Sequence, residues 1–167
     1  MYKGIIFDLD QTLIDTSISE SHRKLRNWSV VYSLIPKFKI YDGINDVFVS
    51  IRKNGVRTCI VTTGQRKYAQ NVVTHFNIPC EFIVDYSSTA RIKPFPDPML
   101  KAIELFRLSN TEVISFGDRA IDIQSSNAAG IKSVACLWGT KEKDELLKCN
   151  PSIIISRPED IIRLLTY

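Results

Sequence analysis

Long hydrophobic runs are missing from this sequence. No apolar stretch among its 167 residues approaches the roughly 20 that a membrane helix needs. The first residues, MYKGIIFDLD, lack the pattern of a signal peptide, because Asp8 interrupts their apolar run at once. We therefore expect a cytoplasmic protein without a membrane partner.

Cysteines are few and widely spaced. The four of them, Cys59, Cys80, Cys136 and Cys149, form no CxxC pair, and such pairs are typical of zinc and redox sites. Three of the four lie in or beside apolar runs. This argues against a disulfide framework or a zinc site, and it predicts buried free thiols.

The chain also lacks a large excess of charge of one sign. Its 22 basic and 18 acidic residues give a net charge of +4, which permits an anionic partner without requiring one. No RNA-binding or DNA-binding motif and no aromatic stacking pattern is present, so a nucleic-acid partner is possible but is supported by no motif. Nothing in the sequence indicates an oligomeric state.

Repeats, low-complexity tracts and long linkers are absent as well. A chain of 167 residues can bury one good hydrophobic core, and 44% hydrophobic with 24% charged residues is an ordinary globular composition. We expect a single domain over residues 1–167.

Short apolar runs alternate with helical patterns along the chain. Most runs are continuous rather than alternating in polarity, which is typical of parallel strands covered on both faces. Strand and helix in repeated alternation predict an α/β fold with a doubly wound parallel sheet and helices on both faces. The predicted strands are Gly4–Phe7, Arg57–Val61, Phe82–Val84, Val113–Phe116, Ser133–Leu137 and Ile153–Ile155.

The intervening helices are predicted from apolar residues three and four positions apart. Ile44, Val47, Phe48 and Ile51 form one such stripe. Similar stripes cover residues 69–76 and 99–106, and helical patterns follow residues 119, 141 and 158. The pair Asp97-Pro98 has the form of an N-cap followed by a proline at the first helical position.

About thirty extra residues interrupt this alternation, in a segment around 15–42. Ser17 and Glu20 have the spacing of a capping box, and apolar residues then recur with helical spacing as far as Pro36. We predict one amphipathic helix over residues 18–35, about 27 Å long at about 1.5 Å per residue. Such a helix is either a lid or side element at the edge of the sheet, or an ordinary crossover helix.

Polar side chains follow the predicted strands at the points where the strands end. Ligands of open parallel sheets bind outside the carboxyl ends of the strands, so we expect these side chains to meet. They are Asp8 and Asp10 after the first strand, Thr62, Thr63 and Gly64 after the second, Lys93 before the helix at Asp97, and Asp118 and Asp122 after the fourth strand.

Several aspartates at one edge of a sheet repel one another. Two unit charges about 4 Å apart repel by about 4 kcal/mol at an effective dielectric constant of about 20. A cluster of Asp8, Asp10 and Asp118 therefore needs a cation, or some of its carboxyls must stay protonated. Oxygen ligands favour a hard ion, and Mg²⁺ suits this set because it keeps coordination positions free for water and substrate phosphate.

Together these residues make the sequence resemble the haloacid dehalogenase superfamily, in its phosphatase branch. Four motifs in order carry the resemblance: DLDQT from Asp8, IVTTG with Thr62, KPFPDP with Lys93, and GDRAID with Asp118 and Asp122. The stretch SSNAAGIKSVACLWG is similar to the phosphoglycolate-phosphatase-like group. The resemblance covers residues 1–167 apart from the segment around 15–42.

The resemblance implies a phosphomonoester hydrolase that works through an aspartyl phosphate. Asp8 matches the nucleophile, and Asp10 matches the general acid and base that protonates the leaving oxygen and then activates water. Thr62 and Lys93 match the residues that hold the phosphate and offset its charge. The substrate-binding residues expected on this basis are Thr62, Thr63, Gly64 and Lys93.

The resemblance also implies a Mg²⁺ cofactor. Asp8 and Asp118 match metal ligands, Asp10 matches the residue that adds its backbone carbonyl, and Asp122 matches the supporting acid of the fourth motif. The phosphorylated substrate itself, whether small molecule or macromolecule, is not implied.

Asp10 separates the branches of the superfamily. The dehalogenases lack this acid and the ion-pumping ATPases carry threonine there, so the resemblance implies a phosphatase or, less favoured, a phosphomutase. A catalytically idle phosphate-binding or scaffold domain is the alternative outside the enzymes, and the intact motifs argue against it. Two residues depart from the family pattern: Gln11 replaces the common glycine, and Arg119 replaces a small hydroxyl residue.

Neither of the two places where the superfamily inserts cap domains holds enough chain for one. The first has only the segment around 15–42, and the 31 residues from Thr62 to Lys93 must already hold a helix and a strand. We therefore expect a minimal cap and an open site, which suits a large phosphorylated substrate or small esters with low selectivity. Basic residues that either ring this opening or are solvated surface charges are His22, Arg23, Lys24, Arg26, Arg66, Lys67, Arg91 and Arg119.

Overall fold

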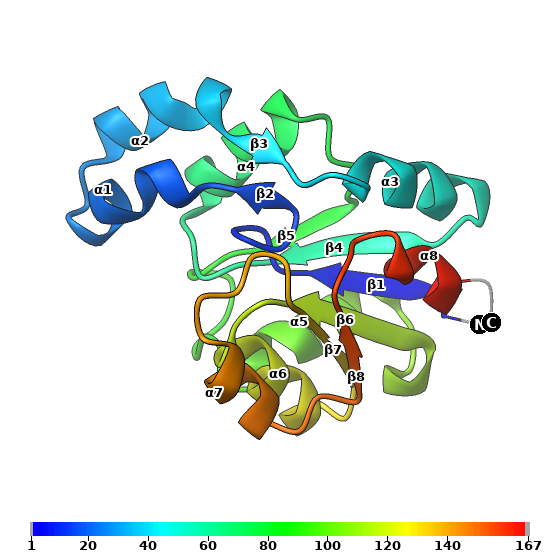
Figure 1. The fold of residues 1–167 in the computed structure, drawn as a ribbon. Coiled ribbons are helices and arrows are strands. Elements are labelled where there is room, and N and C mark those ends of the chain that lie inside the picture. The colour runs from blue at the N-terminus through cyan, green and yellow to red at the C-terminus, as the bar shows by residue number, and fades with distance from the viewer. Residues whose placement is uncertain (1, 166–167) are drawn as a thin grey trace.

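Six parallel strands form the main sheet of the computed structural model, which describes residues 2–165 (Figure 1). Their order across the sheet is β5-β4-β1-β6-β7-β8, so β1 lies in the interior. The strands are β1 (Gly4–Phe7), β4 (Arg57–Val61), β5 (Phe82–Val84), β6 (Val113–Gly117), β7 (Lys132–Cys136) and β8 (Ile153–Ile155). The predicted doubly wound α/β fold is confirmed. Strand β7 is displaced by one residue, and β6 ends one residue later than predicted.

The central strand β1 is buried on both faces because it is apolar at every position. Successive side chains of a strand point to opposite faces. Ile5 and Phe7 accordingly pack into the larger of the two main core clusters, and Ile6 packs into the other. The apolar run that precedes Asp8 thus anchors that residue at the carboxyl end of a rigid strand.

Helices cover both faces of the sheet (Figure 1). Those on the upper face of the view belong to the larger core cluster, and those on the lower face complete the smaller clusters. The upper helices are α3 (Ile44–Lys53), α4 (Arg66–His75) and α8 (Asp160–Leu165), and the lower ones are α5 (Asp97–Phe106), α6 (Ala120–Ala128) and α7 (Lys143–Lys148). A short 3-10 turn, η3 (Asn110–Glu112), precedes β6.

Helix α5 begins one residue earlier than predicted. Pro96 is its N-cap, Asp97 is its first helical residue, and no side chain caps its N-terminus. The Asp97 carboxylate forms an ion pair with Arg91 instead, at 3.0 Å. The predicted Asp97 cap is therefore wrong, because a basic neighbour in the preceding loop takes the carboxylate.

The segment around 15–42 forms a separate small layer. It is framed by two antiparallel strands, β2 (Ile14–Asp15) and β3 (Lys39–Ile40). Between them run η1 (Ser17–Ser19), α1 (Glu20–Lys24), α2 (Trp28–Leu34) and η2 (Ile35–Lys37). We call residues 14–40 the insert; its helices lie on the side where β1 and β4 end (Figure 1).

The prediction of one continuous helix in the insert is wrong. Helix α1 ends at Lys24, with Leu25 as its C-cap, and Arg26 takes a left-handed φ of 55° that turns the chain into α2. Leu25, one of the apolar residues with helical spacing in this segment, is 79% exposed. Ser17 and Glu20 form no capping box either, because Ser17 lies inside η1. The bend lets α1 reach the end of β1 while α2 packs on α4.

The prediction of buried free thiols is confirmed in part. All four cysteines are free, with Cys59 and Cys136 buried and Cys80 and Cys149 partly exposed.

Along residues 2–165, every helix is too short or too polar to cross a membrane.

Candidate active site

Lys93 joins two carboxylates at the carboxyl end of the sheet. Its Nζ donates hydrogen bonds to Oδ1 of Asp8 at 2.7 Å and to Oδ1 of Asp122 at 2.5 Å. It also donates to the Val61 carbonyl at the end of β4, at 2.9 Å. Asp8 follows β1 and Asp122 lies in the first turn of α6, so one buried ammonium group links three elements that are far apart in the sequence.

Asp118 completes an acidic cluster beside this lysine. Carboxylate oxygens of Asp8, Asp118 and Asp122 lie within 4.8 Å of one another. The side chain of Asp118 follows β6, and its Oδ1 accepts a hydrogen bond from Oγ1 of Thr12 at 2.9 Å. The predicted residues of the first and fourth motifs therefore meet.

The three acids of this cluster differ in whether they keep a carboxylate oxygen free to bind a cation. Both oxygens of Asp122 are engaged, one by Lys93 and the other by the backbone N–H of Arg119 at 3.0 Å. Asp8 and Asp118 each keep one oxygen with no hydrogen bond from residues 2–165. Asp122 thus supports Lys93 and the start of α6, while Asp8 and Asp118 have free ligand atoms.

Burial strongly affects the protonation of these acids. Desolvation, aided by repulsion from Asp122, raises the pKa of Asp8 to about 7 although Lys93 acts to lower it. Desolvation and the charge of Asp8 raise the pKa of Asp118 to about 8. A bound cation stabilises both ionised forms. The all-oxygen donor set and its two free oxygens fit a hard ion such as Mg²⁺.

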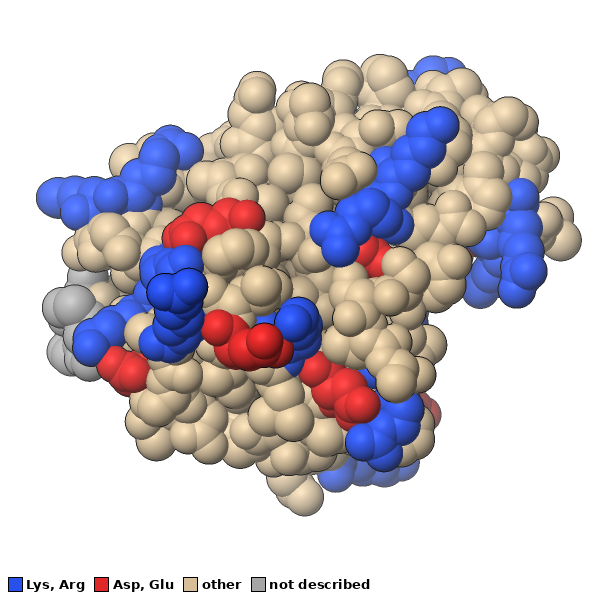
Figure 2. Space-filling model, turned by 180° about the vertical axis from the view of Figure 1, so that it is seen from behind, with Lys and Arg blue, Asp and Glu red and all other residues tan. Residues whose placement is uncertain are grey.

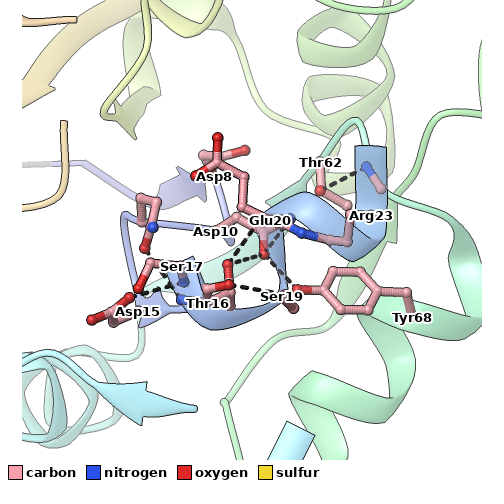
Figure 3. A network of polar contacts seen from close by, with 12 residues as sticks. Asp8, Asp10, Asp15, Thr16, Ser17, Ser19, Glu20, Arg23, Thr62 and Tyr68 are labelled. Carbon is pink, nitrogen blue, oxygen red and sulfur yellow. Dashed lines mark hydrogen bonds and ion pairs between the residues drawn. The ribbon is translucent and has the colours of Figure 1, made fainter. Parts of the chain in front are cut away.

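The Asp10 carboxylate points away from this cluster into a second network (Figure 3). Its Oδ1 accepts hydrogen bonds from Tyr68 at 2.5 Å and from Thr16 at 2.7 Å. Arg23 of α1 completes the network, with its Nη1 2.8 Å from the same oxygen. Asp8 and Asp10 are neighbours in the motif, yet their side chains have separate partners.

Gln11, which follows Asp10, adopts the backbone conformation that turns the chain towards the insert. Gln11 has a left-handed φ of 65°, a conformation that glycine adopts most easily. Its Oε1 accepts hydrogen bonds from the backbone N–H of Thr16 at 3.2 Å and from the Tyr41 hydroxyl at 3.1 Å. These bonds offset the backbone cost, so the departure from glycine is structurally compensated.

The loop after β4 contains the second predicted motif. Oγ1 of Thr62 accepts a hydrogen bond from the backbone N–H of Gly64 at 3.0 Å, which holds the loop closed on itself. Thr62 is buried, whereas Thr63 lines the pocket described below. The loop leads directly into α4, which carries Tyr68.

A pocket of about 360 Å³ joins the two networks. Acids, bases and backbone from the insert and from the sheet ends all contribute to its walls. Its lining residues are Asp8, Asp10, Gln11, Glu20, Arg23, Lys24, Thr63, Lys93, Asp118, Arg119, Ile121, Asp122, Gly139, Lys141 and Glu142.

Only part of the predicted basic ring lines this pocket. Arg23, Lys24 and Arg119 are in its wall. Among the other cations, Arg66 pairs with Asp85 and Arg91 with Asp97, outside the lining. On the face shown in Figure 2, basic and acidic side chains are interspersed rather than gathered into a patch of one sign.

Two partners of Asp10 were not predicted from the sequence. Tyr68 lies in the first turn of α4 and Thr16 follows β2. Neither residue stands at the end of a strand predicted from the sequence, and neither is part of a motif. Trp138 packs against the larger core and donates a hydrogen bond to the Thr12 carbonyl at 2.9 Å.

The fold and the acid–lysine cluster define an α/β protein with a polar site at the carboxyl ends of a parallel sheet. Comparison with known protein families assigns the chain to a family of hydrolases. The model of the haloacid dehalogenase-like hydrolase family matches residues 19–136, a range that contains Thr62, Lys93, Asp118 and Asp122. The chain belongs to this family.

Curated relatives are similar over most of the chain. A PpaX of Caldanaerobacter subterraneus, provisionally described as a pyrophosphatase, is 33% identical over 129 residues, covering 76% of this chain and 57% of that protein. The phosphoglycolate phosphatase of Aquifex aeolicus is 25% identical, covering 76% and 59%. The chain thus spans less than two thirds of the length of these relatives.

Solved structures share the fold over nearly the whole chain. A haloacid dehalogenase-like family hydrolase from Streptococcus pneumoniae superposes with a TM-score of 0.83 at 20% identity, covering 98% of both chains. CbbY from Rhodobacter sphaeroides, in complex with phosphate, gives 0.82 at 14% identity, covering 96% of both.

Proposed function

We propose that this protein is a Mg²⁺-dependent phosphomonoester hydrolase that acts through an aspartyl-phosphate intermediate. The observation that carries the proposal is the buried Asp8–Lys93–Asp122 bridge beside Asp118, at the wall of a pocket. Family membership and the phosphatase names of the relatives support it. We further propose that residues 1–167 act as one domain with the insert as a minimal cap.

In the proposed first step, the free carboxylate oxygen of Asp8 attacks phosphorus and the bond to the leaving oxygen breaks. Lys93 holds the other Asp8 oxygen and supplies a fixed positive charge where negative charge accumulates. Asp10 gives its proton to the leaving oxygen. Thr62, with Thr63 and Gly64 in the same loop, holds the phosphate.

In the second step, water attacks the phosphorus of the Asp8 phosphate and the acyl phosphate bond breaks. Asp10, now ionised, takes the proton from that water, so the protein returns to its starting state with inorganic phosphate as product. The separate hydrogen-bond partners of the two aspartates support this division of roles, since each carboxylate is oriented independently.

The proposed metal ligands are Asp8, Asp118 and the backbone carbonyl of Asp10, with Asp122 in support. Bound there, Mg²⁺ supplies positive charge to the phosphoryl oxygens as they become more negative. The free carboxylate oxygen of Asp118, and the position of Asp8 beside it in the acidic cluster, support this assignment.

A phosphorylated compound is the expected partner. The phosphatase and pyrophosphatase relatives support this class of substrate. The four free thiols support a reducing compartment, and hence the cytoplasm, as the location.

Hydrolysis of p-nitrophenyl phosphate tests the function directly. We expect slow Mg²⁺-dependent release that EDTA stops and that Asp8→Asn reduces to the buffer blank. Asp46→Asn makes the same chemical change at an exposed position of α3 and should retain full activity. Unchanged release in Asp8→Asn would exclude Asp8 as the nucleophile, and no turnover of any ester in a broad phosphate panel would favour a binding domain.

A further inference from the structure

Arg23 is the one cation of the pocket wall that is paired with the proposed general acid. The other basic side chains of the lining have partners elsewhere: Lys93 binds Asp8 and Asp122, Lys24 and Lys141 pair with Glu20, and Arg119 faces Glu142 at 4.0 Å. Arg23 comes from the insert, whereas Asp10 follows the central strand. The insert therefore places a guanidinium group beside the catalytic machinery.

The guanidinium of Arg23 is incompletely bonded. It forms an ion pair with Asp10 and donates one hydrogen bond to Oγ1 of Thr16 at 3.1 Å. Its Nε–H is buried without an acceptor. A guanidinium carries five N–H donors arranged to bind a carboxylate or a phosphate through two parallel bonds. The single carboxylate oxygen of Asp10 does not use that arrangement.

The position of Arg23 relative to the reaction follows from its partner. In the proposed reaction Asp10 donates a proton to the leaving oxygen, so the leaving group lies next to Asp10. Arg23 is 2.8 Å from the Asp10 carboxylate and lines the same pocket. An anionic group carried by the leaving group would thus come within reach of Arg23, and it would offer a second anionic acceptor besides Asp10.

We propose that Arg23 is a specificity-determining residue that binds an anionic group on the leaving group, so that the preferred substrates are small phosphate esters or anhydrides with a second phosphate or a carboxylate. Binding transfers Arg23 from Asp10 to the substrate, which frees Asp10 for proton transfer. This inference rests on the proposed function.

Two hydrogen-bond donors hold Asp10 in place while Arg23 moves from Asp10 to the substrate. Tyr68 and Thr16 still donate to Asp10 when Arg23 leaves, so the carboxylate stays in place. The Arg23 guanidinium lies 5.6 Å from the centre of the Tyr68 ring, which provides a face along which it can shift. Figure 3 shows these three side chains converging on Asp10 from the insert and from α4.

The test compares substrates that differ in the leaving group. Pyrophosphate carries a second phosphate, phosphoglycolate carries a carboxylate, and p-nitrophenyl phosphate carries neither. We expect Arg23→Gln to lower the ratio of kcat/KM for the anionic substrates to that for p-nitrophenyl phosphate by about tenfold or more, as loss of a charge-assisted hydrogen bond predicts. Arg23→Lys keeps the positive charge but lacks the paired N–H donors of the guanidinium. Its ratio should therefore fall between those of the wild type and Arg23→Gln.

Arg26→Gln is the matched control, because Arg26 is an exposed arginine of the same insert outside the pocket lining. It should leave the ratio unchanged. A loss confined to pyrophosphate or to phosphoglycolate identifies the anion that Arg23 binds, and supports the inference. An equal loss on all three substrates in Arg23→Gln overturns it, since Arg23 would then only position Asp10.

A binding measurement separates this inference from the proposed function. By calorimetry in Mg²⁺, methylenediphosphonate should bind wild-type protein more tightly than methylphosphonate, and Arg23→Gln should remove most of that difference. If the wild type cleaves none of the three substrates, the proposed function fails, while this difference still decides the role of Arg23. Equal binding of both phosphonates to the wild type would overturn the inference.

Discussion

Lys93 is the residue on which the charge balance of the site depends. It is 4% exposed and holds two aspartates that would otherwise repel each other. Burial acts to lower the pKa of its ammonium group, but the charges of Asp122 and Asp8 outweigh burial and raise it. Lys93 therefore stays positively charged throughout the neutral range.

Replacing Lys93 by methionine removes that charge and keeps most of the side-chain volume. We expect a loss of about 3–5 kcal/mol in the free energy of unfolding, because the two buried acids lose their partner. Activity should fall by about a hundredfold or more, as when an electrostatic donor is removed from an active site. Urea unfolding and p-nitrophenyl phosphate turnover measure the two effects.

Lys101→Met is the matched control for this substitution. Lys101 lies on the surface of α5 and pairs with Glu104 at 2.9 Å. Exposed pairs contribute about 1 kcal/mol or less, so both stability and activity should be nearly unchanged. Equal losses of stability and activity in Lys93→Met and Lys101→Met would contradict the role of Lys93 in the charge balance of the site.

At the scale of elements, the two α-helices of the insert bury few side chains. Helix α1 has no buried residue, and Val31 is the buried residue of α2. Its contacts with the sheet domain include the Trp28 and Tyr68 rings, whose centres are 6.0 Å apart, and the surface ion pair between Glu20 and Lys141. The insert should therefore open more easily than the sheet unfolds.

Trp28→Ala tests this view of the insert. Loss of the aromatic contact should speed amide hydrogen exchange in α2 by about tenfold, which corresponds to about 1.4 kcal/mol. Exchange in β1 and β6 should stay slow. Leu25→Ala is the control in the same insert, and it should change nothing because Leu25 is 79% exposed. Equal acceleration in the sheet would show that insert and sheet open together.

At the scale of the whole molecule, the acidic cluster opposes folding when it is ionised. The pKa values of Asp8 and Asp118 are raised to about 7 and about 8 in the folded chain, from the ordinary aspartate value of 3.8. The folded state therefore binds more protons than the unfolded state between about pH 4 and pH 8, so stability falls as the pH rises through this window. A cation held by these carboxylates removes the penalty.

Thermal unfolding with and without Mg²⁺ measures this effect. In EDTA, we expect the Tm to fall between pH 6 and pH 8.5, by about 2–4 °C for each kcal/mol lost. Mg²⁺ should raise the Tm more at pH 8.5 than at pH 6. Asp118→Asn removes one of the two titrating acids and should flatten the profile in EDTA. A Tm that rises with pH in EDTA would contradict the raised pKa values.

The sequence was sufficient for the sheet and for the residues at its ends. Continuous apolar runs such as the one before Asp8 predict buried parallel strands, and parallel strands direct their carboxyl ends to one edge. This geometric rule is why Asp8, Lys93, Asp118 and Asp122 could be expected together, and the structure brings them together.

Tertiary structure alone decided the insert and the surroundings of Asp10. Periodicity records where apolar residues recur but not where the chain reverses, so it missed the turn at Arg26 and the exposure of Leu25. Tyr68 and Arg23 meet Asp10 because α4 and the insert pack over the end of β1, and contacts between distant segments leave no local spacing in the sequence. The sequence by itself thus determined the reactive groups, while packing decided which carboxylate each cation binds.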